Sequence, residues 1–244
     1  MSSKFRSNSR LSGDPTDSIA KKGFYIEIFH INSRKTVRFK AILKDYNDMH
    51  NVMYDDQFFV GQSEPIKKWK STVRQIDLSF VALASGISEG KHNLAKVSLL
   101  TNMLYAEQEI DKAGGIITKV GGSPIFRVRL LNLIGASDQG WGEAWDSGLQ
   151  GYISNLMYRI NPDATTFFHA PSLRVSGDSH HVYPQEINIS FTFHPVFERS
   201  PGWIGGLFTV NGRPAGKYPY GVNTENAAAS VSLKGRNSKL KGKN

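Results

Sequence analysis

The sequence contains no cysteine among its 244 residues. That absence excludes a disulfide framework, thiol catalysis and any metal site built on thiolate ligands. Because nothing in the chain needs an oxidising compartment, we expect it to fold in a cytoplasm.

Long apolar runs are also missing. No segment approaches the roughly 18 consecutive apolar residues that predict a membrane-spanning helix. The first residues, MSSKFRSNSRLSGDP, include basic side chains but no apolar core, so they are not expected to act as a secretory signal. The sequence therefore predicts no membrane insertion.

The formal net charge of +9 is concentrated at the two ends of the chain. Residues 1–22 carry five basic and two acidic side chains, and residues 212–244 carry seven basic and one acidic. Residues 23–211 carry 18 of each sign and are neutral. Proteins that bind nucleic acid usually concentrate Lys and Arg on one face of the folded domain. The distribution instead predicts a flexible N-terminal arm (1–22), a β domain (23–211) and a basic C-terminal arm (212–244).

Recognisable catalytic and metal-binding motifs are lacking. There is no GxSxG, and the Gly-rich pieces lack the Lys-Ser/Thr of a phosphate loop. The acidic stretch 45–56 departs from the calcium-loop pattern, and the adjacent His180 and His181 of GDSHH point in different directions on an extended chain. We therefore expect no enzyme activity, cofactor or metal, and an enzyme built on the GDSHH loop is the least favoured alternative.

Alternation of apolar and polar residues predicts several strands. The predicted strands are 24–31, 36–43, 66–82, 124–135, 149–160 and 186–197. In 66–82 the inward positions are Val73, Ile76, Leu78, Phe80 and Ala82, with a bulge near Gln75.

One helix is predicted, beginning with Ser88 as N-cap. Leu94, Val97, Leu100 and Leu104 follow at helical spacing. Six or more strands with one embedded helix predict a mainly β fold, an antiparallel sandwich or barrel with one flanking helix and extended termini. Residues 45–65 lack clean periodicity and predict a long loop or hairpin tip. Little independent structure is expected from Gly212 onward.

Two irregular stretches supply the candidate subunit-interface residues. Large aromatic side chains in segments that offer little core of their own are typical of interface anchors. The candidates are Asp45, Tyr46, Tyr54, Phe58 and Phe59 within 45–65, and Trp141 and Trp145 within the Gly-rich segment 135–148.

The order of several short motifs resembles a known family. The motifs are GQSEPI at 61–66, Trp69, STVR at 71–74, IDLSF at 76–80, LLTNMLY at 99–105, SPIFRV at 123–128, GLQGY at 148–152, YPQEI at 183–187 and FHP at 193–195. This progression, over roughly residues 35–203, resembles the tail-tube-like baseplate proteins of contractile-tailed phages, which start the tail tube on the central hub. One departure is Tyr105-Ala106, where the family pattern has Tyr-Pro.

The resemblance implies a β-sandwich of the tail-tube type and a ring of six copies. The strands of the ring would line a channel through which DNA passes without specific binding. The resemblance also implies contacts with hub, tube and other baseplate proteins, assembly in the host bacterial cytoplasm and a place in the virion. A major tail tube protein or an injection-system tube subunit is the alternative within this class. A nucleic-acid-binding β module that uses the basic C-terminal arm is the alternative from another class.

Overall fold

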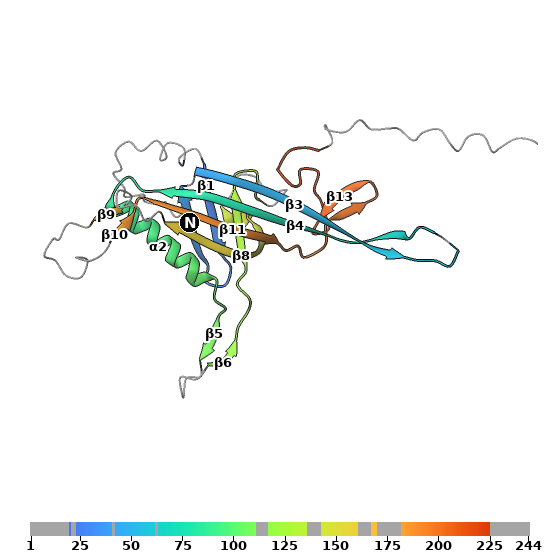
Figure 1. Ribbon diagram of the computed structural model, residues 1–244, viewed down its shortest axis with the longest axis horizontal. Coiled ribbons are helices and arrows are strands. Elements are labelled where there is room, and N and C mark those ends of the chain that lie inside the picture. The colour runs from blue at the N-terminus through green and yellow to red at the C-terminus, as the bar shows by residue number, and fades with distance from the viewer. Residues whose placement is uncertain are drawn as a thin grey trace, which may run out of the picture.

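The computed structural model of the chain describes residues 20, 23–40, 42–61, 63–110, 117–135, 143–160, 167–169 and 182–224. Its main element is an antiparallel sheet of seven strands in the order β2-β1-β7-β8-β11-β4-β3 (Figure 1). The strands are β1 Tyr25–His30, β2 Lys35–Lys40, β3 Ile42–Gln57, β4 Ile66–Leu83, β7 Phe126–Leu130, β8 Leu149–Ile160 and β11 Glu186–Pro195. The predicted mainly β, antiparallel fold is therefore confirmed.

The strongest alternation in the sequence lies at the centre of this sheet. In β11, Ile187, Ile189, Phe191 and Phe193 are buried and the residues between them are half-buried. Successive side chains of a strand point to opposite faces, so β11 contributes every second residue to the core. Its neighbours β4 and β8 pair with it on either side.

The sheet curls until its two ends share one core. Phe39 on β2 and Phe80 on β4 have ring centroids 5.5 Å apart, and Phe80 meets Phe191 edge to face at 6.4 Å. The end strands β2 and β3 are not paired with each other, so no closed barrel forms among the described strands.

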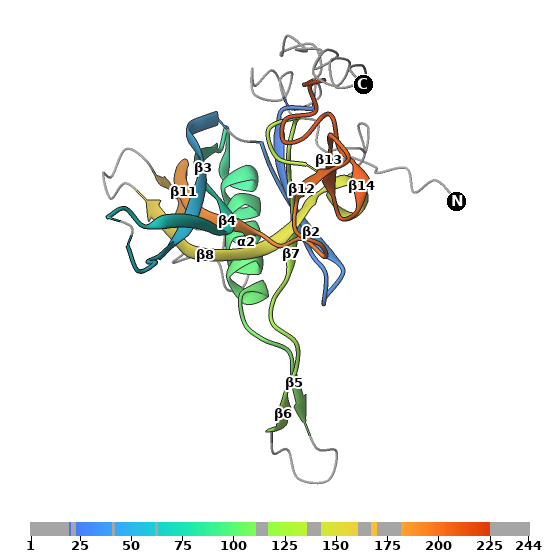
Figure 2. The same cartoon turned by 90° about the vertical axis from the view of Figure 1, so that its right-hand side faces the viewer.

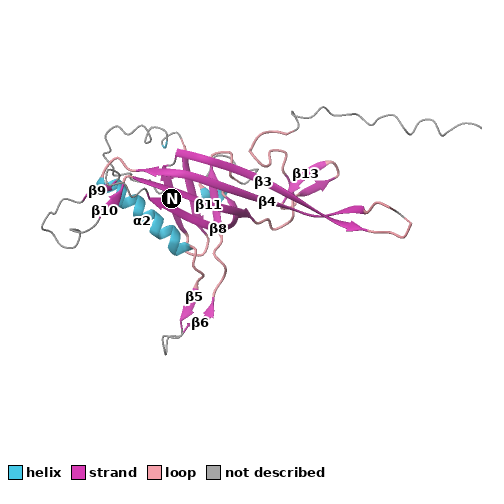
Figure 3. Ribbon diagram, in the orientation of Figure 1, coloured by secondary structure: helices cyan, strands magenta, loops and turns pink. Residues whose placement is uncertain are grey.

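One long helix, α2 (Ile87–Met103), covers the inner face of the sheet (Figure 3). Val97, Leu100 and Met103 form its buried stripe and join the core of the sheet. The helix begins at Ile87 after an extended Gly86, so the predicted N-cap at Ser88 is wrong. The carboxylate of Glu89 instead accepts hydrogen bonds from the backbone N and the Oγ of Ser85, at 2.9 and 2.8 Å, which fixes an earlier start.

Smaller elements surround this body. Two strands, β5 (Gln108–Ile110) and β6 (Ile117–Val120), form an arm that projects from it (Figure 2). The short helix α3 (Ala144–Ser147) packs on β7 and β1. The other pairings are β9 (Phe167–His169) with β10 (Val182–Pro184), and a small sheet of β12 (Gly202–Ile204), β13 (Leu207–Val210) and β14 (Arg213–Pro214).

Three sequence predictions need correction. Residues 45–57 form most of β3, because the stretch pairs with β4 and extends the predicted hairpin tip into two long strands. The register shifts lie at Leu43/Asp45 and Met53/Tyr54, opposite Ser79–Phe80 and Trp69–Ser71 on β4, and not at Gln75. Val73 is exposed rather than inward, because without a bulge at Gln75 it lies on the opposite face of β4 from Arg74 and Ile76.

Folded structure also continues past Gly212. Ala215 is buried, and the backbone N of Tyr218 donates to the carbonyl of Ala215 at 3.0 Å. The expectation of little structure there is wrong as far as Thr224, the last described residue, because tertiary contacts hold this segment. The predicted N-terminal arm and the rest of the C-terminal arm lie almost wholly outside the described residues.

Candidate assembly interface

The ends of β3 and β4 project beyond the body as a two-stranded hairpin (Figure 1). We call residues 49–73 the ribbon. Each of its strands pairs only with the other there, since β11 pairs with β4 only from Ile76 onward. A two-stranded hairpin alone is marginally stable in water, so such a projection fits a segment that binds a partner.

Large apolar side chains are exposed along the ribbon. Phe58 is 77% exposed and Trp69 54%, and Val60 is fully exposed. Many large apolar side chains exposed on one projection are typical of an interaction surface. Its members are Val52, Met53, Tyr54, Phe58, Phe59, Val60, Ile66, Trp69 and Val73.

Charge pairs fix the register of the ribbon, where no buried face can do so. Asp56 lies opposite Lys67 and forms an ion pair with it at 2.8 Å. Asp55 lies opposite Lys68 and pairs with Lys70 at 3.4 Å. Opposite charges on facing strands favour this pairing and disfavour a slipped one.

A buried ion pair lies at the root of the ribbon. The Arg74 guanidinium donates from Nε to Oδ1 of Asp48 at 3.0 Å and from Nη2 to Oδ2 at 2.7 Å. The two side chains are only 2% and 3% exposed. This two-pronged geometry is the strong form of the Arg–carboxylate interaction.

Three tyrosines enclose the ion pair. Tyr220 donates its hydroxyl to Oδ2 of Asp48 at 3.0 Å, and the Tyr46 hydroxyl lies 3.1 Å from the carbonyl oxygen of Leu133. Cζ of Arg74 lies 5.4 Å from the centroid of the Tyr218 ring. Tyr218 and Tyr220 therefore contact Arg74 and Asp48 at the point where β3 and β4 leave the body.

Burial shifts the pKa of these groups, and the ion pair decides the sign for Asp48. Burial alone would raise the pKa of the Asp48 carboxyl, but hydrogen bonds from Arg74 and Tyr220 lower it below its ordinary value. Burial, reinforced by the nearby Asp48 charge, raises the pKa of Tyr46. Burial also raises the pKa of Tyr218 and Tyr220, against the opposing effect of Arg74. The root is therefore charged at Asp48 and Arg74 and neutral at its tyrosines near pH 7.

Aromatic contacts connect the root of the ribbon to the small sheet of β12, β13 and β14. Tyr218 stacks on Phe208 of β13 with centroids 5.5 Å apart, and Phe208 meets Trp203 of β12 at 5.4 Å. Figure 1 shows β13 beside the stretch where β3 and β4 leave the body. The small sheet thus supports the root of the ribbon from one side.

The sequence-predicted interface residues divide into three groups. Tyr54, Phe58 and Phe59 lie exposed on the ribbon, and Asp45 is exposed on β3 nearer the body. Tyr46 is half-buried in the root, where it packs against the core. Trp141 lies outside the described residues.

Trp145 is half-exposed on α3, at a separate place on the sheet. Its indole Nε1 donates to Glu143 at 3.0 Å, and Arg127 donates to its carbonyl oxygen. The buried Glu27 carboxylate accepts from the backbone N of Ala144 at 2.9 Å. Trp145 is therefore held firmly, but on β1 and β7 rather than beside the ribbon.

Catalytic chemistry has little support in the described part of the chain. Ser154 Oγ lies 2.9 Å from Nε2 of His194, and the His194 ring stacks on Tyr152. No carboxylate is hydrogen-bonded to His194 there, so the orienting group of a nucleophile triad is missing from that set. No cluster of three or more potential ligands that could hold a metal occurs among the described residues, and the GDSHH histidines lie outside them.

Sequence reasoning missed the root of the ribbon. Arg74 stands two residues before Ile76, in phase with the inward positions of β4. A charge at an inward position predicts a buried partner, so this spacing was an available signal. Tyr218 and Tyr220 gave no local signal, because only the tertiary fold brings them to Asp48.

No described helix is long and apolar enough to cross a membrane. A scan of the sequence against models of protein families finds no match, and a search of curated proteins finds none.

Proposed function

We propose that the protein is a structural subunit of a phage baseplate or tail tube, forming a ring that joins the central hub to the tube around a DNA channel. The curled antiparallel sheet with one flanking helix is compatible with the β-sandwich of the tail-tube type that the sequence motifs resemble. Six copies per ring, hub and tube partners, and a virion location follow from that resemblance.

The ribbon is the observation that carries this proposal. It exposes apolar side chains far beyond the body, yet a buried ion pair and three tyrosines hold its root. A projection that is rigid at its base and apolar along its length suits a permanent contact with another subunit.

Two further features support an assembling subunit. The end strands β2 and β3 of the sheet leave one edge each without a paired strand in the described fold, and pairing with neighbours in a ring would satisfy both edges. The segment 23–211 is electrically neutral, which suits a conduit, because a strongly basic wall would retain DNA through its phosphates.

Light scattering and negative-stain electron microscopy of the purified protein at rising concentration test the proposal. We expect hollow rings or short tubes, formed either by the chain alone or once hub proteins provide a template. A compact globular dimer at all concentrations, with or without hub proteins, would contradict a ring. Tight DNA binding that falls steeply with salt would favour the nucleic-acid-binding alternative.

A further inference from the structure

We propose that the tip of the ribbon of one copy binds a polar pocket on the sheet of a second copy, with Glu64 facing Arg159 and Lys44. This inference rests on the proposed self-assembly and names the contact that would produce it. The two complementary surfaces lie at opposite ends of the same long strands.

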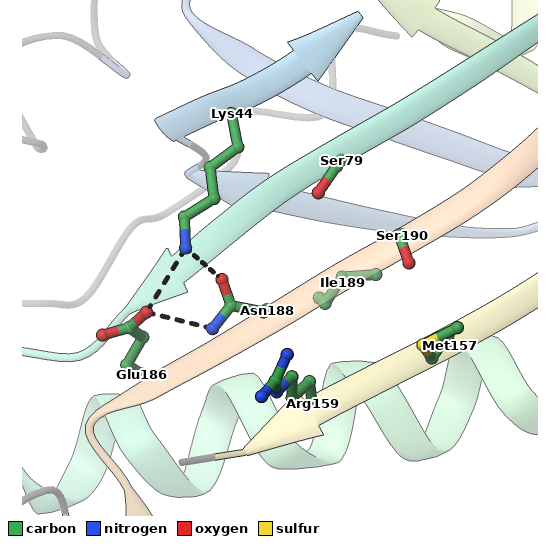
Figure 4. Close-up of a pocket in the computed structure, with 8 residues that line it drawn as sticks. All are labelled: Lys44, Ser79, Met157, Arg159, Glu186, Asn188, Ile189 and Ser190. Atoms are coloured by element: carbon green, nitrogen blue, oxygen red, sulfur yellow. Dashed lines mark hydrogen bonds and ion pairs between the residues drawn. The ribbon is translucent and has the colours of Figure 1, made fainter.

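The pocket is a hollow of about 500 Å³ on the face of the sheet turned away from α2 (Figure 4). Strands β3, β4, β8 and β11 provide its lining. Lys44 Nζ donates to Oδ1 of Asn188 and lies 3.7 Å from the Glu186 carboxylate. Arg159 is exposed and forms no ion pair within the described part of the chain. Two cations against one carboxylate leave the pocket with an excess positive charge.

The turn of the ribbon, residues 57–66, carries one charged side chain, that of Glu64. Glu64 is exposed beside the turn, and its carboxylate has no ion-pair partner among the described residues. Phe58 and Val60 are highly exposed nearby, and Met157, 62% exposed, gives the pocket an apolar wall. A free acid with apolar neighbours therefore matches a free guanidinium beside an apolar side chain.

Strand length excludes a contact within one molecule. The strand β4 runs from Ile66 near the tip to Ser79 in the pocket, which is about 13 residues at about 3.3 Å each, or about 43 Å. A tip therefore reaches only the pocket of another copy. Such a head-to-tail contact is heterologous, so it builds a ring where the rotation between neighbouring copies closes and an open stack where it does not.

Charge reversal tests the pair. We expect Glu64→Arg alone and Arg159→Glu alone each to raise the concentration needed for assembly about tenfold or more, and the double variant to restore much of it. Glu198→Arg, which reverses an exposed acid off the ribbon, should assemble as the parent does. Circular dichroism checks that every variant is folded.

Cross-linking gives an independent readout, because the chain has no cysteine. Under assembling conditions, a short bismaleimide linker should join Glu64→Cys chains to Arg159→Cys chains when the two are mixed, and should produce a ladder from the double variant. Absence of the mixed product, with assembly intact and insensitive to both charge reversals, would overturn the contact and leave the proposed function standing. A parent chain that assembles under no condition, with or without hub proteins, would overturn both.

Discussion

Phe39 on β2 and Phe80 on β4 bring their ring centroids to 5.5 Å, although four strands separate β2 from β4 in the order of the sheet. Both rings are fully buried. Their contact is the point at which the curled sheet packs on itself. A flat sheet would leave both rings on one open face.

Removal of the Phe39 ring should therefore destabilise the whole fold. We expect Phe39→Ala to lower the free energy of unfolding by about 3–5 kcal/mol, since the ring fills a packed core that cannot fully collapse. Phe24→Ala, at a half-exposed ring before β1, should cost about 1 kcal/mol or less. Urea unfolding followed by tryptophan fluorescence measures both, and equal effects would contradict the shared core.

The Arg74–Asp48 pair gives a second prediction. Asp48→Asn leaves the guanidinium buried without its counter-charge, so we expect a loss of about 3–5 kcal/mol in the free energy of unfolding. The exposed pair Asp56–Lys67 on the ribbon is the matched control, and Lys67→Ala should cost about 1 kcal/mol or less. A loss for Asp48→Asn as small as that of the control would show that the root does not stabilise the fold.

The tyrosines of the root predict a loss of stability at high pH. Burial raises the pKa of Tyr46, Tyr218 and Tyr220 above the ordinary value of 10.0. Their contribution is fully present below about pH 10 and is lost as the pH rises further, because the unfolded chain ionises first. Urea midpoints at about pH 8 and about pH 11 should differ less in Tyr46→Phe than in the parent. An identical alkaline loss in both proteins would contradict this role for Tyr46.

Gly151 on β8 offers a steric prediction. A Cβ at this position would lie 2.2 Å from the carbonyl oxygen of His194 and 2.7 Å from the Phe193 ring. Both neighbours belong to the paired strand β11, so Gly151→Ala should destabilise by about 1–3 kcal/mol. Gly202→Ala on β12, where nothing lies within 4 Å, is the control and should change stability little. Thermal unfolding of the two variants separates these outcomes.

The predictability of each segment from sequence follows from whether one of its faces is buried. Ile187 to Phe193 alternate strictly because one face of β11 meets the core, and this pattern predicted the strand correctly. Residues 50–57 carry no such pattern, because side chains on both faces of β3 are exposed there. Charge pairing between Asp55–Asp56 and Lys67–Lys70 fixes its register instead, a signal that hydrophobic periodicity does not contain.

The exposed residues of the candidate interface were predictable from the sequence, but the residues that hold the ribbon were not. Tyr54, Phe58 and Phe59 were recognised as large side chains without a core, and the ribbon exposes all three. The root of the ribbon was not predicted, because Asp48 and Tyr220, which are hydrogen-bonded there, stand 172 positions apart in the chain. Tertiary contacts of that range leave no trace in local composition.

We propose that the ribbon is the element through which this subunit assembles. Sedimentation velocity of the parent and of a Tyr54→Ser, Phe58→Ser, Val60→Ser variant, at matched concentrations and with hub proteins present if the parent requires them, tests it most directly. These side chains are exposed, so the free energy of unfolding of the variant, measured in urea, should agree with that of the parent within about 0.5 kcal/mol. We expect large assemblies for the parent and a folded monomer for the variant. Assemblies of equal size from both proteins would contradict it.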